Sequence, residues 1–380
     1  MTKGKLSVLE SAMLIAGSGL GTGILAIPYA ASKTGFYSIV LLIIIAYAVT
    51  AVLHLLAADL VLHSKNSSQL IGIFNEHLFR GKHGNILTLF FFIVLAIVLF
   101  LNLTIYIIVA SDVMITVLPL SDTIAKIFFY GISSLIVFLG IKIIGLSEKY
   151  SMILIFLVVL YLSVLSRWNI VRDLNFTFGN PMMAIALYGM LMFSFSALFS
   201  VPQVVNNIEN KSKIKFAIIV GIGANALITM IFTIGVLIAS QEVTTIATIG
   251  LSSSIGLVSQ IACSIFVLLA MFTSYWSIAL AQLDIIHEQT KLNRKLCWLV
   301  ATVPTLIISI FLPGSYISYI QIAGGSVAVI IGCLLLPAYY KAVVNSKDKL
   351  ILGRIGKSKT LLLFIFACYL IMAVSSFVKI

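Results

Sequence analysis

Residues 13–30 combine the apolar pattern of a membrane-spanning helix with several glycines, and glycine is the residue that best exposes main-chain polar groups. This run, Met-Leu-Ile-Ala-Gly-Ser-Gly-Leu-Gly-Thr-Gly-Ile-Leu-Ala-Ile-Pro-Tyr-Ala, is long enough to cross a bilayer, yet it contains Gly17, Gly19, Gly21 and Gly23. Because each glycine costs a helix interior about 1 kcal/mol relative to alanine, we expect the helix to break there. Unpaired N–H and C=O groups persist at membrane depth only where protein, water or a ligand satisfies them. The break therefore predicts half of a ligand site in a membrane transporter.

Close helix packing is the alternative interpretation of these glycines. Gly17 with Gly21, and Gly19 with Gly23, each form a G-x-x-x-G pair. The two pairs point to opposite sides of an ideal helix, whereas one packing face needs only one pair, so we favour the broken helix. A phosphate-binding loop is excluded, because no strand precedes the glycines and no Lys-Ser/Thr follows them.

A second stretch repeats this pattern at residues 193–202, Phe-Ser-Phe-Ser-Ala-Leu-Phe-Ser-Val-Pro. It is again small and hydroxyl-bearing, and Pro202 follows its polar centre as Pro28 follows the glycines. The span that contains it is the sixth of the chain. An odd offset of five spans gives the second set of helices the opposite orientation to the first. Paired interrupted spans in two inverted halves indicate a transporter site at the bilayer midplane.

Composition requires an all-α, polytopic membrane protein. Hydrophobic residues make up 61% of the chain and charged residues only 9%. We expect one transmembrane domain over residues 1–380, with a first five-helix repeat at 6–166, an inverted repeat at 181–340 and an additional helix at 359–378. The eleven expected spans are 6–32, 36–62, 86–110, 124–144, 148–166, 181–206, 214–239, 256–284, 297–312, 316–340 and 359–378.

Basic residues fix the expected orientation of these spans. Alternating the loops places all but five of the 24 Lys and Arg residues on the side of the N-terminus. The positive-inside rule then predicts a cytoplasmic N-terminus in the cell membrane, and the net charge of +12 reflects topology rather than binding of nucleic acid. We expect a short interfacial helix within residues 64–84 and a lid-like outer loop at 240–255. The four cysteines show no metal-ligand spacing and no disulfide framework.

Three stretches together resemble the amino acid/auxin permease family and the related aromatic amino acid permeases, within the amino acid–polyamine–organocation superfamily. The first is Gly-Thr-Gly-Ile-Leu-Ala-Ile-Pro-Tyr-Ala at 21–30 with Thr-Gly-Phe at 34–36; the second is Tyr106 with Ser-Asp-Val-Met at 111–114; the third is residues 193–203. The resemblance implies a LeuT-type 5+5 inverted repeat with discontinuous helices 1 and 6, and amino acid transport by alternating access coupled to H⁺ or Na⁺. Leu198 stands where many relatives have a histidine, and Gly17 stands where sodium-coupled neutral amino acid transporters have an asparagine.

The two breaks suit a zwitterion. After the first break, the amides from about Leu20 to Gly23 lie at the positive end of a helix dipole and can bind a carboxylate, with the Thr22 hydroxyl as a further donor. Freed carbonyls supply acceptors for an ammonium group, and neither break contains an acidic residue. The predicted substrate-binding residues are Gly17, Ser18, Gly19, Leu20, Gly21, Thr22, Gly23, Asn102, Tyr106, Phe193, Ser194, Phe195, Ser196 and Ala197. Asn102 and Tyr106 share one helix face and can equally form a polar pair between helices, and the phenylalanines can equally be core.

The coupling cation has two candidate sites. Thr273, Ser274 and Ser277, with the backbone of Gly17 and Leu20, resemble a Na⁺ site of this fold, although hydroxyls also commonly bond their own helix. Proton coupling needs a titratable group in the membrane, for which Glu10, His54 and Asp59 are available. Glu10 and Asp59 can instead pair with basic residues at an inner gate, and Asp284 can pair there with Lys3 or Lys5.

We therefore predict a secondary active transporter for neutral, hydrophobic or aromatic amino acids, monomeric in the bilayer and without a cofactor other than the coupling ion. An amino-acid-sensing receptor on the same fold, similar to a germinant receptor subunit, and a permease for another small solute stay open. An enzyme is not expected, because no nucleophile–base pair or metal cluster is visible in the sequence.

Overall fold

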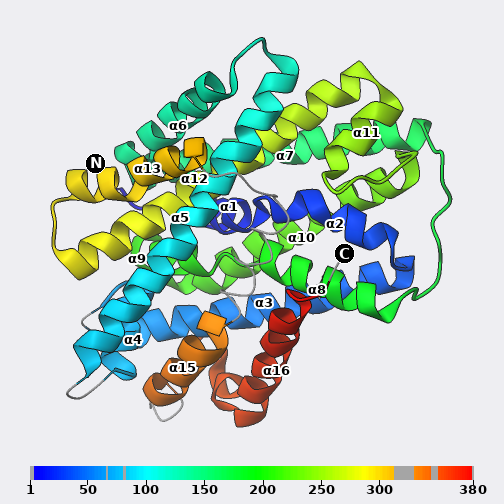
Figure 1. Ribbon diagram of the computed structural model, residues 1–380. Helices are drawn as coiled ribbons and strands as arrows, with labels where there is room; N and C mark the ends of the chain where they lie inside the picture. The colour runs from blue at the N-terminus through cyan, green and yellow to red at the C-terminus, as the bar shows by residue number, and fades with distance from the viewer. Residues whose placement is uncertain (1–3, 66, 80–82, 312–328, 344–349, 379–380) are drawn as a thin grey trace.

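The chain forms a helical bundle in which a broken central span is surrounded by long apolar helices (Figure 1). The computed structural model describes residues 4–65, 67–79, 83–311, 329–343 and 350–378. The α-helices within these residues are α1 (Val8–Leu20), α2 (Gly23–Ser32), α3 (Phe36–His63), α4 (Leu70–His77), α5 (Gly84–Val117), α6 (Asp122–Leu139), α7 (Ile141–Trp168), α8 (Pro181–Ser194), α9 (Val201–Asn207), α10 (Ile214–Ala239), α11 (Ala247–Ile255), α12 (Leu257–Thr290), α13 (Arg294–Phe311), α15 (Leu336–Val343) and α16 (Lys359–Ser375).

Two spans are interrupted, as the sequence predicts. Helices α1 and α2 form one span that bends by 57° at a two-residue break. The other is divided into α8, a short 3₁₀ turn at Leu198–Ser200, and α9. Helix α1 packs against α10, α7 and α12, while α2 packs against α8. Both interruptions therefore lie inside the bundle, with neighbouring helices available to satisfy their main-chain groups.

Local sequence explains the ends of these helices. Ser7 caps α1: its hydroxyl accepts from the Glu10 amide at 3.2 Å, and the Glu10 carboxylate accepts from the Ser7 amide at 2.7 Å. This reciprocal arrangement is a capping box, which satisfies two donors that a helix start leaves unpaired. It fixes the start of α1 and holds the Glu10 side chain close to the helix end.

One expected boundary is wrong. The sequence pattern places residues 145–147 in a loop between two spans, whereas α6 ends at Leu139 and α7 begins at Ile141. The turn is Gly140 alone, with φ of 95°, a conformation that favours glycine over other residues. Lys142 and Glu148 consequently lie on α7, and the Glu148 side chain is buried inside the bundle.

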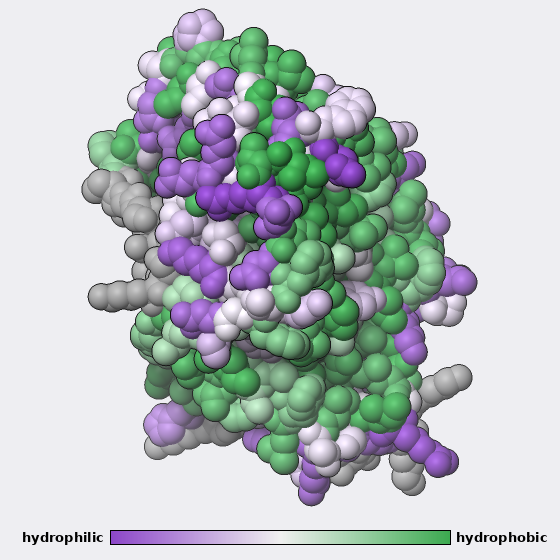
Figure 2. Space-filling view, turned by 90° about the vertical axis from the view of Figure 1, so that its right-hand side faces the viewer, coloured by the Kyte–Doolittle hydropathy of each residue, from purple (hydrophilic) through white to green (hydrophobic). Residues whose placement is uncertain are grey.

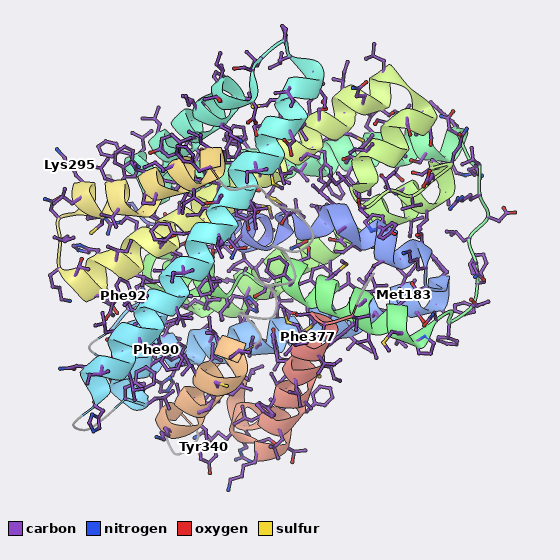
Figure 3. The ribbon with its side chains drawn as sticks, viewed as in Figure 1. Phe90, Phe92, Met183, Lys295, Tyr340 and Phe377 are labelled. Atoms are coloured by element: carbon purple, nitrogen blue, oxygen red, sulfur yellow. The ribbon has the colours of Figure 1, made fainter. Side chains whose placement is uncertain are left out.

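The outer surface is apolar along the helices. Eight described helices are long and apolar enough to cross a membrane, and the bent α1–α2 pair makes a ninth. Large hydrophobic side chains project from the bundle without covering partners, among them Phe90 on α5 and Phe377 beyond α16 (Figure 3). On the end that faces right in Figure 1, hydrophilic side chains gather in a band with hydrophobic ones beside it (Figure 2). This distribution is that of a multi-pass membrane protein.

Two isolated backbone bridges join the interrupted spans at opposite ends. Leu6, before α1, pairs with Ile208, after α9. Thr34, after α2, pairs with Gly179, before α8. We call these the N-terminal bridge and the distal bridge. They match the expected inverted relation between the halves, because the start of one span meets the end of the other each time.

The expected connecting segments are also helical in part. Within residues 64–84 the short helix is α4, and within 240–255 the described helix α11 packs against α10, α12 and α2. Much of the expected span 316–340 lies outside the described residues; the part within them is a π-helical turn at Ile331–Leu335 followed by α15.

Candidate functional site

The break in the first span consists of Gly21 and Thr22, and a single hydroxyl bridges it. The Ser274 Oγ atom on α12 accepts from the Gly21 amide at 2.9 Å and donates to the Gly17 carbonyl at 2.9 Å. Gly21 has φ of 34°, in the left-handed region that favours glycine. Ser274 thus satisfies one acceptor at the end of α1 and one donor at the break, where the helix itself leaves both unpaired.

The break in the sixth span is held by two residues from other helices. Asn225 Nδ2 on α10 donates to the Ser194 carbonyl at 2.8 Å, at the end of α8. The Ala197 amide donates to His54 Nε2 at 2.8 Å, and His54 Nδ1 lies 2.7 Å from the Thr50 carbonyl. Nε2 accepts and Nδ1 donates, so the network assigns a neutral imidazole with its proton on Nδ1.

Glycine is required where the two interruptions approach one another. A Cβ atom on Gly19 would lie 2.7 Å from the Ser194 carbonyl oxygen and 2.8 Å from Asn225 Nδ2. A Cβ atom on Gly23, the first residue of α2, would lie 3.1 Å from Ser194 Cβ. The Ser200 hydroxyl donates directly to the Ser18 hydroxyl at 2.8 Å. The structure therefore brings the two predicted anchor stretches into contact.

Ser194 supplies a polar group without a partner at this junction. Its hydroxyl is buried and forms no hydrogen bond among the described residues. The position of a Cβ atom on Gly23 lies 3.5 Å from this hydroxyl, so the group sits beside the first turn of α2. The amides of a first helical turn have no intrahelical acceptor, and they lie at the positive end of the helix dipole. A donor hydroxyl beside such a turn is suited to bind a carboxylate.

The other predicted pocket residues take different positions. Tyr106 on α5 is buried, with its hydroxyl near Gly21 and interacting with Ser274. Asn102, one turn earlier, instead donates to the Val98 carbonyl of its own helix at 3.0 Å. Phe195 is buried and Phe193 is half-buried at the end of α8. Tyr106 therefore reaches the first break, whereas the Asn102 amide is used within α5.

The hydroxyls of the predicted Na⁺ site divide between two roles. Thr273 donates to the Ala270 carbonyl at 3.0 Å, and Ser277 donates to the Thr273 and Ser274 carbonyls, so both bond their own helix. Only Ser274 reaches across to the first span. Within the described part of the chain, no group of three His, Cys, Asp or Glu residues could hold a metal ion. Sodium binding here stays a prediction.

The three predicted gate residues lie near the N-terminal bridge or at the ends of neighbouring helices. Glu10 pairs with Lys142 on α7 at 2.9 Å, and a gating role for this pair stays a prediction. Asp59 instead accepts from the Ile351 amide at 2.9 Å. The expected pairing of Asp284 with Lys5 is wrong, because Asp284 pairs with Arg294 at 2.8 Å, and Lys3 lies outside the described residues. Ten residues of chain separate Asp284 from Arg294, so the short turn before α13 makes this local pair easier to form.

A polar vestibule opens beside these gate residues. It is a cavity of about 920 Å³ lined by residues from the ends of α3, α9 and α12, including Asp284 and Arg294. Its wall also contains Lys5, next to the N-terminal bridge. This position makes the vestibule a water-accessible approach to one end of the two broken spans.

The sequence does not predict the roles of two residues that bond main-chain groups at the second break. Asn225 was not identified, because a lone asparagine in an apolar helix gives no signal of the distant carbonyl it meets. His54 was identified only as a titratable group, and its bond to Ala197 depends on packing of α3 against α8. A buried polar residue at a position where helices pack together is the one signal that both share.

A broken pair of inverted spans inside a bundle of long apolar helices defines a LeuT-fold membrane transporter. The chain belongs to the tryptophan/tyrosine permease family, whose model matches residues 4–376. The family match confirms the expected resemblance, and the shared fold confirms the expected fold class. The protein is a secondary transporter of the amino acid permease type and not an enzyme.

Two solved transporters share the fold at low sequence identity. Mhp1, a nucleobase-cation-symport-1 family transporter in a closed conformation with bromovinylhydantoin bound, superposes with a TM-score of 0.71 at 11% identity, covering 98% of this chain and 91% of its own. MhsT in complex with L-phenylalanine gives a TM-score of 0.69 at 16% identity, covering 99% of this chain and 100% of its own. No curated protein sequence matches the chain.

Proposed function

We propose that this permease carries an aromatic amino acid across the cell membrane by alternating access, driven by a cation gradient, with its N-terminus in the cytoplasm. The observation that carries the proposal is the buried, unpartnered Ser194 hydroxyl beside Gly23. It marks the junction of the two breaks as a place where a ligand group completes the hydrogen bonding. Family membership supports the transport of tryptophan or tyrosine.

The substrate carboxylate is assigned to the first turn of α2, with the Ser194 hydroxyl as a donor. The ammonium group is assigned to carbonyls at the ends of α1 and α8, which carry the negative ends of their helix dipoles. The aromatic side chain is assigned to Phe193 and Phe195, where ring–ring contacts favour it over an aliphatic one by about 0.5–1.5 kcal/mol. Together the three contacts select a zwitterion with an aromatic side chain.

Uptake by purified protein in proteoliposomes tests this function. Labelled tryptophan, tyrosine and phenylalanine are offered in turn, and unlabelled amino acids of each chemical class compete for entry. We expect aromatic amino acids to be accumulated and to compete, whereas lysine and glutamate do not. Accumulation of a charged or aliphatic amino acid in preference would contradict the proposed substrate class. Saturable binding without flux would instead indicate a receptor.

A pair of serine variants tests the site. We expect Ser194→Ala to raise the KM for the aromatic substrate by about tenfold, the effect of one lost hydrogen bond to a charged group. Ser32→Ala removes an exposed hydroxyl at the end of α2 that bonds only the Tyr29 carbonyl, and it serves as the matched control. Equal KM values for the two variants would show that the Ser194 hydroxyl does not bind the substrate.

The proposed orientation has its own test. A cysteine introduced at the exposed Glu242, in the segment before α11, would be labelled by an impermeant maleimide added to intact cells. Labelling only after the cells are opened would contradict the proposed orientation and place residue 242 in the cytoplasm.

A further inference from the structure

The carboxylate of Glu288 caps the start of a helix to which it does not belong. Glu288 lies in the last turn of α12, and its Oε2 atom accepts from the Ser68 amide at 2.9 Å, the Ser68 hydroxyl at 2.8 Å and the Gln69 amide at 3.1 Å. Helix α4 begins at Leu70, and the Gln69 side chain at its N-cap forms no capping bond. Glu288 therefore replaces a local cap, at the positive end of the α4 dipole. We call these three hydrogen bonds the α4 clamp.

A glycine makes room for this carboxylate. Gly72 lies in the first turn of α4 and is buried, and a Cβ atom on it would overlap Glu288 Oε1. That oxygen is itself buried and forms no hydrogen bond among the described residues. A larger residue at position 72 would displace the carboxylate from its Ser68 and Gln69 donors. Gly72 and Glu288 are thus fitted to each other, although they lie far apart in the chain.

The α4 clamp is also connected to a broken span. The Ser68 carbonyl accepts from Asn206 Nδ2 at 3.3 Å, and Asn206 lies near the end of α9. Helix α9 is the half of the sixth span that the N-terminal bridge ties to the segment before α1. Ser68 is therefore bonded to α12 through its amide and hydroxyl, and to α9 through its carbonyl. Separation of Asn206 from Glu288 requires one of these bonds to break or residues 67–69 to change shape.

The residues joined in this way form part of the wall of the polar vestibule. Both partners of each bond line that cavity of about 920 Å³: Ser68, Gln69, Asn206 and Glu288. Asp284, one turn earlier on α12, also lines the cavity, but its carboxylate pairs with Arg294 at the start of α13. Glu288 instead bonds the segment that contacts α9. The α4 clamp therefore joins the vestibule wall to a moving part that the transport cycle requires.

We propose that Glu288 is a positioning residue of the transport cycle, a proposal that rests on the proposed transport function. Its carboxylate fixes residues 67–69 between α12 and α9, and this keeps α9 packed on α1 at the vestibule end of the two broken spans. When the carboxylate releases Ser68 and Gln69, α9 is free to separate from α1, and the vestibule extends to the breaks. The α4 clamp thereby sets the balance between these two arrangements.

Labelling of a buried cysteine tests this role. Leu14 on α1 is fully buried and lies one turn before Ser18, on the helix face that meets α9. In a chain whose four native cysteines are alanine, we expect Leu14→Cys to react slowly with an impermeant maleimide. We expect Glu288→Ala to raise that rate about tenfold, the effect of one lost hydrogen bond to a charged group. Glu288→Gln, which keeps an acceptor oxygen, is expected to give a smaller rise. The exposed Glu242→Ala is the matched control and should give none.

A second variant tests the fit between the two helices. We expect Gly72→Ala to raise the labelling rate in the presence of Glu288 and to add nothing in the Glu288→Ala background, because it acts by displacing the carboxylate. Gly131→Ala is the matched control, since a Cβ atom there meets nothing within 4 Å. Equal increases from Gly72→Ala in both backgrounds would overturn the proposal. Should Glu288→Ala fail to reach the membrane, Gly72→Ala alone gives the test, and an unchanged labelling rate would contradict it.

The outcomes separate this role from a purely structural one and from the function on which it rests. A lower melting temperature for Glu288→Ala with unchanged labelling of Leu14→Cys would show that Glu288 only stabilises α4, and would overturn the proposal. A wild-type protein that neither exchanges nor accumulates aromatic amino acids would refute the transport function. Labelling of Leu14→Cys is measured without substrate, so the two failures are distinguishable.

Discussion

The Ser200 hydroxyl donates a hydrogen bond of 2.8 Å to the Ser18 hydroxyl, and this bond joins the two interrupted spans directly. Both side chains are buried, one in the last turns of α1 and the other at the start of α9. Ser18 precedes the first break and Ser200 follows the second, so the bond joins the same two halves, α1 and α9, as the N-terminal bridge. It therefore stabilises the arrangement in which α1 and α9 lie together.

Ser200→Ala should weaken that arrangement. The variant removes one buried hydrogen bond, so we expect a loss of about 1 kcal/mol in the free energy of unfolding. Thermal unfolding of the detergent-solubilised protein measures the change, with Ser32→Ala as the exposed control. A melting temperature equal to that of the control would show that the Ser18–Ser200 bond contributes nothing to this state.

Gly19→Leu should abolish uptake while the protein still inserts into the membrane. Even a Cβ atom at this position overlaps the Ser194 carbonyl and the Asn225 amide, and the larger side chain must push the two breaks apart. Uptake in cells, normalised to the amount of protein in the membrane fraction, measures the effect. Gly131→Leu is the matched control, since a Cβ atom on Gly131 meets nothing within 4 Å. Wild-type uptake by the Gly19 variant would show that the junction is not the transport site.

His54→Ala should destabilise the sixth span. It leaves the buried Ala197 amide without its acceptor, at an expected cost of about 1–3 kcal/mol. We also expect lower uptake, because the break then has no fixed geometry. Unfolding temperature and uptake are measured on the same preparation. If His54→Ala retained both, the assigned contact with Ala197 would not be needed to hold the break.

The Glu10–Lys142 ion pair should make a small contribution to stability, because the Lys142 side chain is 39% exposed. A double-mutant cycle with Glu10→Gln and Lys142→Gln isolates the interaction, and glutamine at position 10 keeps the capping box with Ser7. We expect a coupling free energy of about 1 kcal/mol or less that decreases with salt. A coupling free energy of zero at low salt would show that this ion pair does not stabilise the contact between α1 and α7.

The spans, both interruptions and their inverted relation follow from the sequence, because apolar length, glycine clusters and proline positions are local signals. The tertiary partners of buried polar side chains are not encoded by such local signals. Asn225 and His54 each meet a main-chain group in a distant segment, and nothing near them in the sequence encodes that distance. Glu148 was missed for a different reason: the predicted spans treated 145–147 as a loop, whereas Gly140 alone makes the turn. The pairing of Asp284 with Arg294 was likewise missed in favour of a remote lysine.

The N-terminal and distal bridges consist of main-chain hydrogen bonds, such as the Leu6 amide to the Asn207 carbonyl at 2.8 Å and the Glu209 amide to the Leu6 carbonyl at 2.9 Å. Every amino acid except proline can supply these donors. The N-terminal bridge therefore depends little on the side chains present, whereas the distal bridge needs glycine at position 179, where φ is 63° and a Cβ atom would overlap the Gly35 amide nitrogen. Each bridge ties one half of the first broken span to one half of the second, α1 to α9 and α2 to α8, at the ends that lie away from the breaks.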